Sequence, residues 1–374
     1  MKKRLSMIPV TKPFLPPINE YQNLIAGVWD RNWLTNDGPL VKQLEGQLKP
    51  YLGVEHLYTG SGTMALQLTI KALNLTGEII TTPFSYVATT SSIVWEGCTP
   101  VFVDIDPRTL NINAGLIEES ITENTEAILA THIFGNPCDI GAIQVIADKY
   151  KLKVIYDGAH AFGTTLEGQS VFNFGDISIT SFHATKLFHT VEGGAVFTKD
   201  REVYERLKYL RNFGHDGEEK FNGIGINGKN SEFHAAMGLV NMKYIDDILT
   251  RRKEQAAYYD ELLEKVDCAN QENSVFGQVN YAYYPILLKS PEILVKIREA
   301  LVSINIYTRR YFYPGLNMLD YVGYKPMPIA EDISSRILCL PLYHELEENE
   351  QRTIVKTIID SLIKKYHSTP KVKL

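Results

Sequence analysis

The sequence predicts an α/β protein in which a mostly parallel central sheet is flanked by helices and followed by a smaller C-terminal α+β domain. Between about residues 55 and 200, short β-branched runs alternate with helical patterns, which is typical of parallel strands joined by crossover helices. After about residue 245 the pattern changes to a charged helix and isolated strands. The 374 residues are about enough for two domains. We expect a large domain at residues 1–245 and a small one at 246–374.

The expected strands of the large domain are short and apolar. In chain order they lie at residues 56–59, 78–81, 100–104, 127–130, 152–157, 177–182 and 194–198. Between them, residues 64–73 form an apolar helix, and Ile140, Ile143 and Ile146 fall on one face of another. Ligands of such sheets bind at the carboxyl ends of the strands and at the helix starts that follow them.

The small domain is predicted from fewer elements. A charged amphipathic helix begins at Arg251, and residues 281–288 and 337–342 have strand character. A helix from about Asn349 to Tyr366 closes the fold. The remaining residues, 367–374, are expected to form a loose tail.

Composition and charge exclude several classes of protein. Hydrophobic residues make up 44% and charged residues 22%, as in ordinary globular chains. The formal net charge of −6 disfavours nucleic acid as a partner. The longest uncharged run, Ile79 to Trp95, contains Pro83 and several hydroxyl residues, so no membrane insertion is expected. The start, Met1-Lys-Lys-Arg, leads into prolines instead of an apolar segment, which favours a cytoplasmic location.

The four cysteines are widely scattered. Cys98, Cys138, Cys268 and Cys339 form no pair with zinc-ligand spacing. We therefore expect reduced, structural thiols and no metal site.

A glycine-containing turn, Gly60-Ser-Gly-Thr-Met-Ala, follows a strand and opens a helix. Its backbone N–H groups could bind a phosphate. The turn also satisfies the dinucleotide pattern G-x-G-x-x-G/A, and Glu78 lies about where a ribose-binding acid would be. An NAD(P)-dependent oxidoreductase is therefore one alternative, and a tight turn without a ligand is another.

Two charged residues at strand ends have the chemistry that pyridoxal phosphate needs. Asp157 ends an apolar strand and could pair with a protonated pyridine nitrogen, although it could also simply cap a helix. Lys186 follows the next strand and could form a Schiff base with an aldehyde cofactor if it is desolvated. A lone lysine is more often a solvated surface group. Ser181 could donate its hydroxyl to a phosphate at the same strand end.

Several motifs occur together in an order that resembles one family. They are Trp33-Leu-Thr-Asn-Asp-Gly-Pro, Ser61-Gly-Thr, Pro83-Phe-Ser-Tyr-Val-Ala-Thr, Phe102-Val-Asp-Ile-Asp, Tyr156-Asp-Gly-Ala-His-Ala, Ser181-Phe-His-Ala-Thr-Lys, Glu192-Gly-Gly-Ala and Gly225-Ile-Asn. From about Pro9 to the final helix the chain resembles the DegT/DnrJ/EryC1/StrS sugar-nucleotide aminotransferases. These are fold type I pyridoxal-phosphate enzymes, so the resemblance implies that fold and pyridoxal 5′-phosphate as the cofactor.

The resemblance also implies roles around the cofactor ring. Lys186 would be the catalytic residue that holds the cofactor as a Schiff base, and Asp157 would pair with the pyridine nitrogen. His160 would lie near the 3′-oxygen of the ring, and Tyr86 would stack on its face. Each has a plainer alternative, because Tyr86 could be a core residue and His160 a satisfied buried histidine.

Other residues would hold the phosphate and the substrate. By resemblance, Gly62, Thr63 and Ser181 would bind the cofactor phosphate. Asn227 would reach the cofactor phosphate of the opposite subunit, which implies a homodimer with shared active sites. The candidate substrate-binding residues are Thr35, Arg309 and Tyr313, and the basic group could serve a sugar diphosphate or belong to a solvated face.

The implied reaction moves an amino group from L-glutamate to C4 of a nucleotide-linked 4-keto-6-deoxy sugar. The amino-acid sequences of the motifs favour dTDP-4-dehydro-6-deoxy-D-glucose as the acceptor. Its aminated product would be used in the synthesis of a surface glycan such as O-antigen. Lys186 favours transamination over dehydration, because related sugar-deoxygenating enzymes have histidine there. The alternatives are amination at C3, a UDP-linked substrate, and a regulatory protein that retains the cofactor without turnover.

Overall fold

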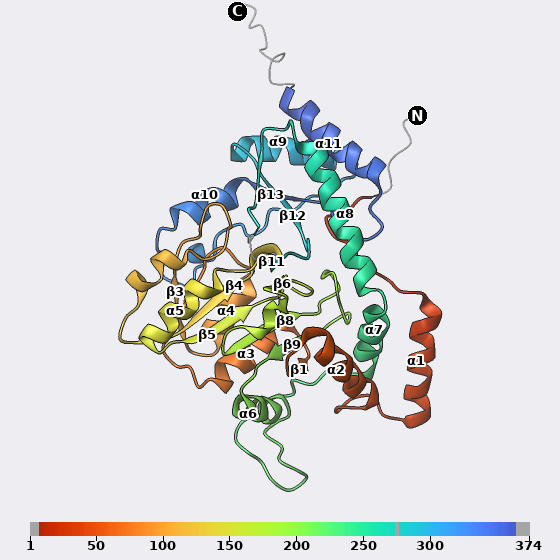
Figure 1. Ribbon diagram of the computed structural model, residues 1–374, viewed down its shortest axis with the longest axis vertical. Coiled ribbons are helices and arrows are strands. Elements are labelled where there is room, and N and C mark those ends of the chain that lie inside the picture. Colours follow the sequence, from red (N-terminus) through yellow and green to blue (C-terminus); the bar gives the residue numbers. More distant parts are fainter. Residues whose placement is uncertain (1–6, 274–276, 364–374) are drawn as a thin grey trace, which may run out of the picture.

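The computed structural model of the protein describes residues 7–273 and 277–363 (Figure 1). A seven-stranded sheet lies at its centre. From one edge to the other its strands are β1 (His56–Thr59), β9 (Gly194–Phe197), β8 (Ile177–Ser181), β5 (Lys153–Asp157), β4 (Thr125–Thr131), β2 (Glu78–Thr81) and β3 (Thr99–Phe102). Strand β9 is antiparallel to both neighbours, and the pairs from β8 to β3 are parallel. The predicted mostly parallel sheet is confirmed.

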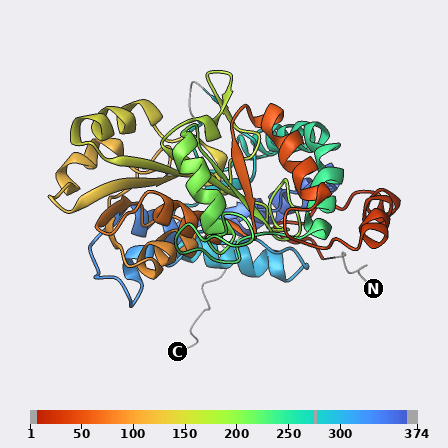
Figure 2. The ribbon, with the colours of Figure 1, turned by 90° about the horizontal axis from the view of Figure 1, so that it is seen from below.

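Helices cover both faces of this sheet (Figure 2). They are α3 (Gly62–Ala72), α4 (Val87–Trp95) and α6 (Arg201–Arg211) on one face and α5 (Ile140–Tyr150) on the other. Successive strand residues point to opposite faces, so Ile79 packs with α3 and Ile80 with α5. Because both faces are covered, most adjacent residues of β2, β4 and β5 are buried.

A layer of three helices packs beside the β1 edge of the seven-stranded sheet. It consists of α1 (Ile18–Arg31), α2 (Pro39–Leu52) and α7 (Glu232–Met242). The buried carboxylate of Glu232 accepts the N–H of Leu40 at 3.1 and 3.0 Å and the N–H of Val41 at 3.0 Å. It therefore caps the N-terminus of α2 from another helix.

The C-terminal part contains a second, smaller sheet. Its strands are β10 (Ala269–Asn270), β12 (Tyr284–Leu287) and β13 (Ile337–Leu340), all antiparallel, and its helices are α8 (Ile245–Leu263), α9 (Pro291–Val302), α10 (Pro328–Arg336) and α11 (Glu348–Ile363). A third sheet joins β11 (Gly277–Gln278), β6 (Thr165–Leu166) and β7 (Gln169–Ser170). The helix predicted from Arg251 begins six residues earlier, because Asp246 and Asp247 in its first turn favour a helix start there.

The N-terminal segment completes the C-terminal core. Ile8 is 1% exposed and packs in the same cluster as Ile297 and Leu301 of α9. Its N–H donates to Asn305 at 3.0 Å, and its carbonyl accepts the N–H of Tyr307 at 2.8 Å. The division into domains 1–245 and 246–374 stays a prediction.

The remaining expectations have mixed outcomes. The strand expected at 281–288 is limited to β12. The last residues of the expected closing helix, the tail 367–374 and the Met1-Lys-Lys-Arg start lie outside the described residues.

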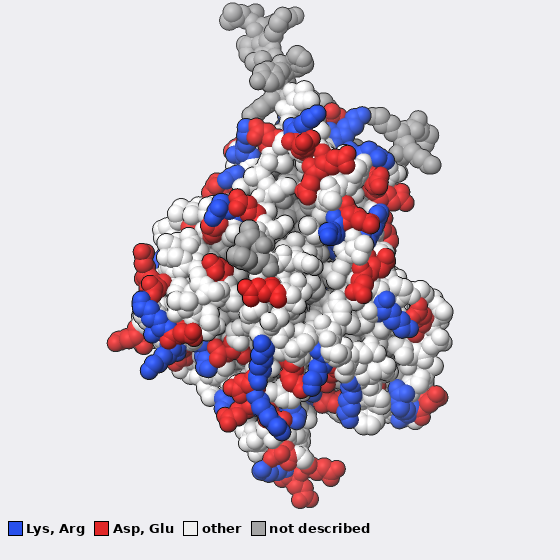
Figure 3. All heavy atoms as spheres, in the orientation of Figure 1, with Lys and Arg blue, Asp and Glu red and all other residues white. Residues whose placement is uncertain are grey.

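All four cysteines are free, and burial raises the pKa of the Cys138 thiol. In residues 7–273 and 277–363, no helix combines the length and apolarity that a membrane crossing requires. Acidic and basic side chains are interspersed over the face in Figure 3.

Candidate active site

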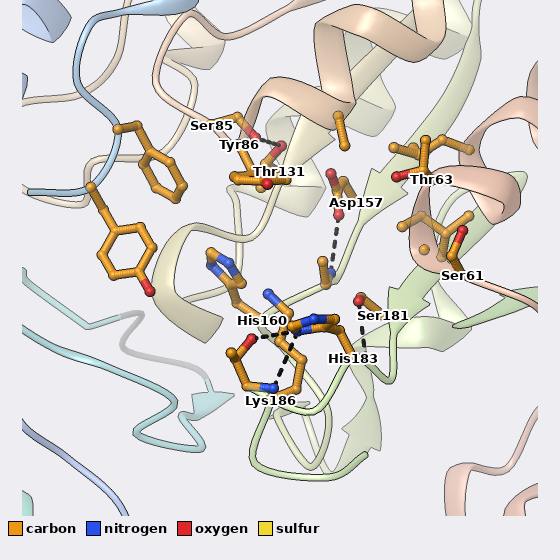
Figure 4. Close-up of a pocket in the computed structure, with 18 of the residues that line it drawn as sticks. Ser61, Thr63, Ser85, Tyr86, Thr131, Asp157, His160, Ser181, His183 and Lys186 are labelled. Atoms are coloured by element: carbon orange, nitrogen blue, oxygen red, sulfur yellow. Dashed lines mark hydrogen bonds between the residues drawn. The ribbon is translucent and has the colours of Figure 1, made fainter. Parts of the chain in front are cut away.

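A cavity of about 290 Å³ lies where the parallel strands β5 and β8 end (Figure 4). Its walls come from strand ends, from the starts of α3 and α4, and from the segment 309–312 of the C-terminal part. The sequence-predicted residues that line it are Gly62, Thr63, Tyr86, Asp157, His160, Ser181, Lys186 and Arg309. The fold therefore brings most of the predicted residues to one place.

One end of the cavity is built around the start of α3. Ser61 caps this helix by accepting the N–H of Met64 at 3.1 Å. A β-carbon at Gly62 would stand 2.8 Å from the Ser181 β-carbon, so the helix start lies directly against the end of β8. A helix N-terminus and a serine hydroxyl side by side form a site for a phosphate.

Asp157 lies at the end of β5 and is 4% exposed. Its Oδ1 accepts the N–H of Ala159 at 3.0 Å, and its Oδ2 accepts the hydroxyl of Thr89 at 2.9 Å. Burial raises the pKa of Asp157, while these hydrogen bonds and the Lys186 charge oppose the rise. A buried carboxylate of this kind suits a cationic partner, such as a protonated pyridine nitrogen.

Lys186 lies in the turn after β8, where its backbone N–H donates to His183 at 2.9 Å. Burial lowers the pKa of Lys186 to about 8, although the charges of Asp157 and Tyr86 act in the opposite direction. The positive charge of Arg309 adds to the lowering. A larger share of the Lys186 amine is therefore neutral near pH 7 than for an ordinary lysine, which suits a nucleophile and proton carrier.

His160 is 6% exposed and is surrounded by aromatic rings. Its ring lies parallel to Phe134 and Phe312, with interplanar angles of 5° and 11°, and 4.7 Å from Tyr283. Burial lowers the pKa of His160 well below its usual value, so the ring is neutral. Its Nδ1 has no hydrogen-bond partner within the described part of the chain, and it is thus available to a bound group.

Two further predicted residues lie at the cavity edge. Tyr86 precedes α4 and is 54% exposed, so its ring can cover a flat ligand. The guanidinium of Arg309 lies 4.7 Å from the ring centre of Tyr311, and its backbone pairs with Cys339 in both directions. Arg309 therefore places a positive charge at the cavity edge, and its backbone is fixed there by the pairing with Cys339.

Three predicted residues do not line the cavity of the single described chain. The Thr35 hydroxyl donates to the Asn230 carbonyl at 3.5 Å, and Asn227 is exposed in the segment between α6 and α7. The Tyr313 ring is covered by the Arg310 guanidinium at 3.6 Å. Their functional roles stay predictions.

Other residues of the lining were given no role from the sequence, although Ser85 and Glu192 lie in the quoted motifs. These residues include Ser85, Thr131, Glu192, Tyr283, Tyr311 and Phe312. Thr131 ends β4, so the positional signal that identified Asp157 could also have found it. Tyr283 and Phe312 have no comparable local signal, because they reach the cavity through the packing of the C-terminal part.

The dinucleotide alternative does not fit this geometry. Glu78 lies at the amino end of β2, away from the cavity, where it accepts the hydroxyls of Thr122 at 2.5 Å and Thr125 at 3.2 Å. Strands β1 and β2 are also not neighbours in the sheet. A dinucleotide-binding unit needs its first two strands parallel and close together, with the acid at the carboxyl end of the second.

Comparison with known proteins decides the family. The sequence profile of the DegT/DnrJ/EryC1/StrS aminotransferase family matches residues 18–359. The chain belongs to this aminotransferase family. The family predicted from the motifs is therefore confirmed, and so is the predicted fold class.

Relatives within the family match nearly the whole chain. The chain is 43% identical over 359 residues to a dTDP-4-amino-4,6-dideoxy-D-glucose transaminase of Shigella dysenteriae, covering 93% of this chain and 97% of the relative. It is 39% identical to a protein of the same name from Escherichia coli, with 95% and 99% covered. The solved structure of DesI in the presence of its TDP-sugar product is similar, with a TM-score of 0.91, 31% identity and 96% and 94% coverage.

Members of this aminotransferase family depend on pyridoxal 5′-phosphate, and the cavity fits this group. The helix start at Gly62 suits its phosphate, the carboxylate of Asp157 its ring nitrogen, and the amine of Lys186 its aldehyde. The Nδ1 atom of His160, which has no partner among the residues that the structure describes, offers one further polar contact.

Proposed function

We propose that this aminotransferase moves an amino group from L-glutamate to C4 of dTDP-4-dehydro-6-deoxy-D-glucose and so forms dTDP-4-amino-4,6-dideoxy-D-glucose. The observation that carries the proposal is the 43% identity to a transaminase named for this product, spread over 97% of that relative. The presence of Lys186 in the cavity beside Asp157 supports an amine-transferring chemistry.

The proposed roles at the ring follow from the surroundings of each side chain. Bound pyridoxal phosphate acts as an electron sink for the carbon that carries the transferred amine. Lys186 attaches the cofactor and, once released, moves the proton at that carbon. Asp157 would hold the proton on the ring nitrogen. Tyr86 would cover one face of the ring, and His160 would offer its ring to the 3′-oxygen.

The proposed phosphate site consists of Gly62, Thr63 and Ser181. A helix N-terminus contributes partial positive charge there, which favours a dianionic phosphate. Because Gly62 lacks a side chain, its backbone can lie against Ser181 and leave room for the phosphate oxygens.

We also propose a homodimer in which Asn227 contacts the cofactor phosphate of the second copy. Asn227 is exposed and does not line the cavity of its own chain. The segment that carries it projects beyond α6 (Figure 1) and exposes Phe221 to 62% and Ile224 to 89%. Exposed apolar side chains on a projecting segment support an intermolecular contact.

The donor and acceptor substrates would share the side of the cavity that is formed by the C-terminal part. Arg309 adds a guanidinium there, and guanidinium groups bind carboxylates and diphosphates through two parallel hydrogen bonds. Arg309 is thus the proposed ligand of the acidic substrates. Thr35 and Tyr313 are proposed to bind the sugar nucleotide from outside the cavity.

The product would enter the synthesis of a surface glycan such as O-antigen, and the enzyme would work in the cytoplasm, where nucleotide sugars are supplied. Deletion of the gene should remove the 4-amino-4,6-dideoxy sugar from the glycan of the source organism. Cell fractionation should recover the activity with the soluble proteins. An unchanged glycan would contradict the proposed pathway.

A spectroscopic titration tests the activity itself. L-glutamate should bleach the visible absorbance of the purified enzyme, and dTDP-4-dehydro-6-deoxy-D-glucose should restore it after the excess donor is removed. NMR of the product then separates C4 from C3 amination, and the UDP-linked sugar serves as the matched acceptor. Bleaching without recovery would reject the proposed sugar while retaining the cofactor chemistry.

A further inference from the structure

Three buried hydroxyls form a line that ends on Asp157. The Thr89 hydroxyl lies 2.9 Å from the Asp157 Oδ2 atom. Ser85 Oγ lies 2.8 Å from Thr89 Oγ1 and 3.1 Å from Thr131 Oγ1. Each of the three hydroxyl residues is 2% exposed or less. We call this set, Thr131, Ser85 and Thr89, the hydroxyl chain; Figure 4 labels Ser85, Thr131 and Asp157.

The direction of the hydroxyl chain follows from the number of protons. An ionised carboxylate can only accept hydrogen bonds, so Thr89 must donate its single proton to Asp157. Thr89 must then accept from Ser85, and Ser85 must in turn accept from Thr131. All three hydroxyls therefore donate toward the carboxylate, and donation in one direction strengthens the last hydrogen bond.

The hydroxyl chain counteracts what burial does to Asp157. Burial favours the neutral carboxylic acid, whereas hydrogen bonds donated to the carboxylate favour the charged form. The backbone N–H of Ala159 donates to Oδ1 and the hydroxyl chain donates to Oδ2. With one donor on each oxygen, the plane of the carboxylate is fixed, and lone pairs remain for a third donor.

The hydroxyl chain also connects two sides of the site. Thr89 lies in the first turn of α4, and its backbone N–H donates to Tyr86 at 3.0 Å. Ser85 directly precedes Tyr86, which lies at the cavity edge. The helix start that presents the Tyr86 ring is thus tied to the carboxylate on β5 and to the end of β4.

We propose that Thr89 is a positioning residue that, with Ser85 and Thr131 behind it, holds Asp157 ionised and oriented toward the pyridine nitrogen of the cofactor. The inference rests on the role proposed above for Asp157. It assigns a function in the site to residues that the sequence motifs did not single out as ligands.

The test uses the variants Thr89→Val and Thr89→Ser of the holoenzyme. Valine has the shape of threonine without the hydroxyl, and serine keeps the hydroxyl. The matched control is Thr90→Val, because Thr90 is equally buried on α4 and its hydroxyl has no partner among the described residues. Each protein is loaded with pyridoxal phosphate labelled with ¹⁵N in the ring, and both the ¹⁵N chemical shift and the dissociation constant of the cofactor are measured.

We expect Thr89→Val to move the ring nitrogen signal toward that of the unprotonated ring and to raise the dissociation constant about tenfold. Thr89→Ser and Thr90→Val should match the unchanged protein. If Thr89→Val does not fold, Ser85→Ala interrupts the chain one step earlier and should move the signal in the same direction.

Asp157→Asn tests the role of Asp157 separately from the role of the hydroxyl chain. If Asp157→Asn moves the nitrogen signal and neither Thr89→Val nor Ser85→Ala does, the inference about the hydroxyl chain is overturned and the role of Asp157 stands. If Asp157→Asn leaves the signal unchanged, the proposed role of Asp157 fails, and the inference fails with it.

Discussion

A β-carbon on Gly194 would lie 2.5 Å from the carbonyl carbon of Ser61, closer than such atoms approach in folded proteins. The start of β9 therefore passes directly under the residue that caps α3. This close approach brings the helix N-terminus to the carboxyl end of β8, where Ser181 supplies its hydroxyl. The geometry of the proposed phosphate site thus depends on the absence of a side chain at Gly194 in β9.

Gly194→Ala should destabilise the protein by about 2 kcal/mol or more, because the backbone of α3 has to move to admit a methyl group. The affinity for pyridoxal phosphate should fall as well. Urea denaturation and cofactor titration measure the two effects. Gly46→Ala is the matched control, since Gly46 is an exposed residue of α2 with open space around it, and it should stabilise the protein by about 0.5 to 1 kcal/mol. Equal effects at both sites would contradict the argument.

Lys186→Ala should lower the turnover number about a thousandfold or more, because it removes the proposed attachment point and proton carrier together. Single-turnover measurements of both half-reactions report the loss. Lys253→Ala, at an exposed position on α8, serves as the control and should keep full activity. Substantial turnover by Lys186→Ala would refute the assignment.

The stability of the cofactor-free protein should depend on pH through Lys186. Burial lowers the pKa of Lys186 to about 8 in the folded protein, from 10.5 for an ordinary lysine. Below pH 8 both the folded and the unfolded chain carry the proton, and the folded state bears the full cost of the buried charge. Between these two pH values the unfolded chain binds more protons, so the free energy of unfolding rises with pH.

Lys186→Met should therefore be more stable than the unchanged protein below pH 8, by up to about 3 kcal/mol. This advantage should shrink as the pH approaches 10.5. Urea denaturation between pH 7 and pH 10.5 measures this difference in the free energy of unfolding, with Lys253→Met as the surface control. A difference that stays constant with pH would show that the Lys186 amine is not desolvated.

Asp157→Asn should retain pyridoxal phosphate while lowering turnover by between about tenfold and a hundredfold, because the amide no longer stabilises charge on the ring nitrogen. Stopped-flow measurement of the glutamate half-reaction reports the change. Asp139→Asn, at the exposed cap of α5, is the corresponding control and should be active. Normal rates in Asp157→Asn would reduce Asp157 to a structural role.

The local sequence predicted strands well where the strand is buried on both faces of the sheet and therefore forms a short apolar run. The run Glu78 to Thr81 is β2 in the structure, and His56 to Thr59 is β1. The reversal of β9 could not be predicted in this way, because the direction of a strand depends on how its connection crosses the sheet. Arg251 was predicted to begin a helix because its charges mark an amphipathic pattern, yet the helix starts at the apolar residue Ile245.

Site residues could be predicted from the sequence where they lie at the carboxyl end of a recognisable strand. Asp157 and Ser181 both follow apolar runs, and each lies at a strand end that lines the cavity. Thr89 ends the motif Pro83 to Thr89, but that motif does not indicate its contact with Asp157, 68 residues away. Tyr283 and Phe312 depend on how the C-terminal part packs, which a local pattern does not encode.

The parallel bridge between Ile8 and Ile306 has a consequence for synthesis of the chain. During translation, Ile8 emerges from the ribosome long before residue 306, and chains grow at about 5 to 20 residues per second. For that interval Ile8 lacks the hydrophobic cluster in which it finally lies. The small sheet and its helices therefore close over a strand-like segment that was made first, so an isolated C-terminal fragment would need residues near Ile8 added in trans to complete its core.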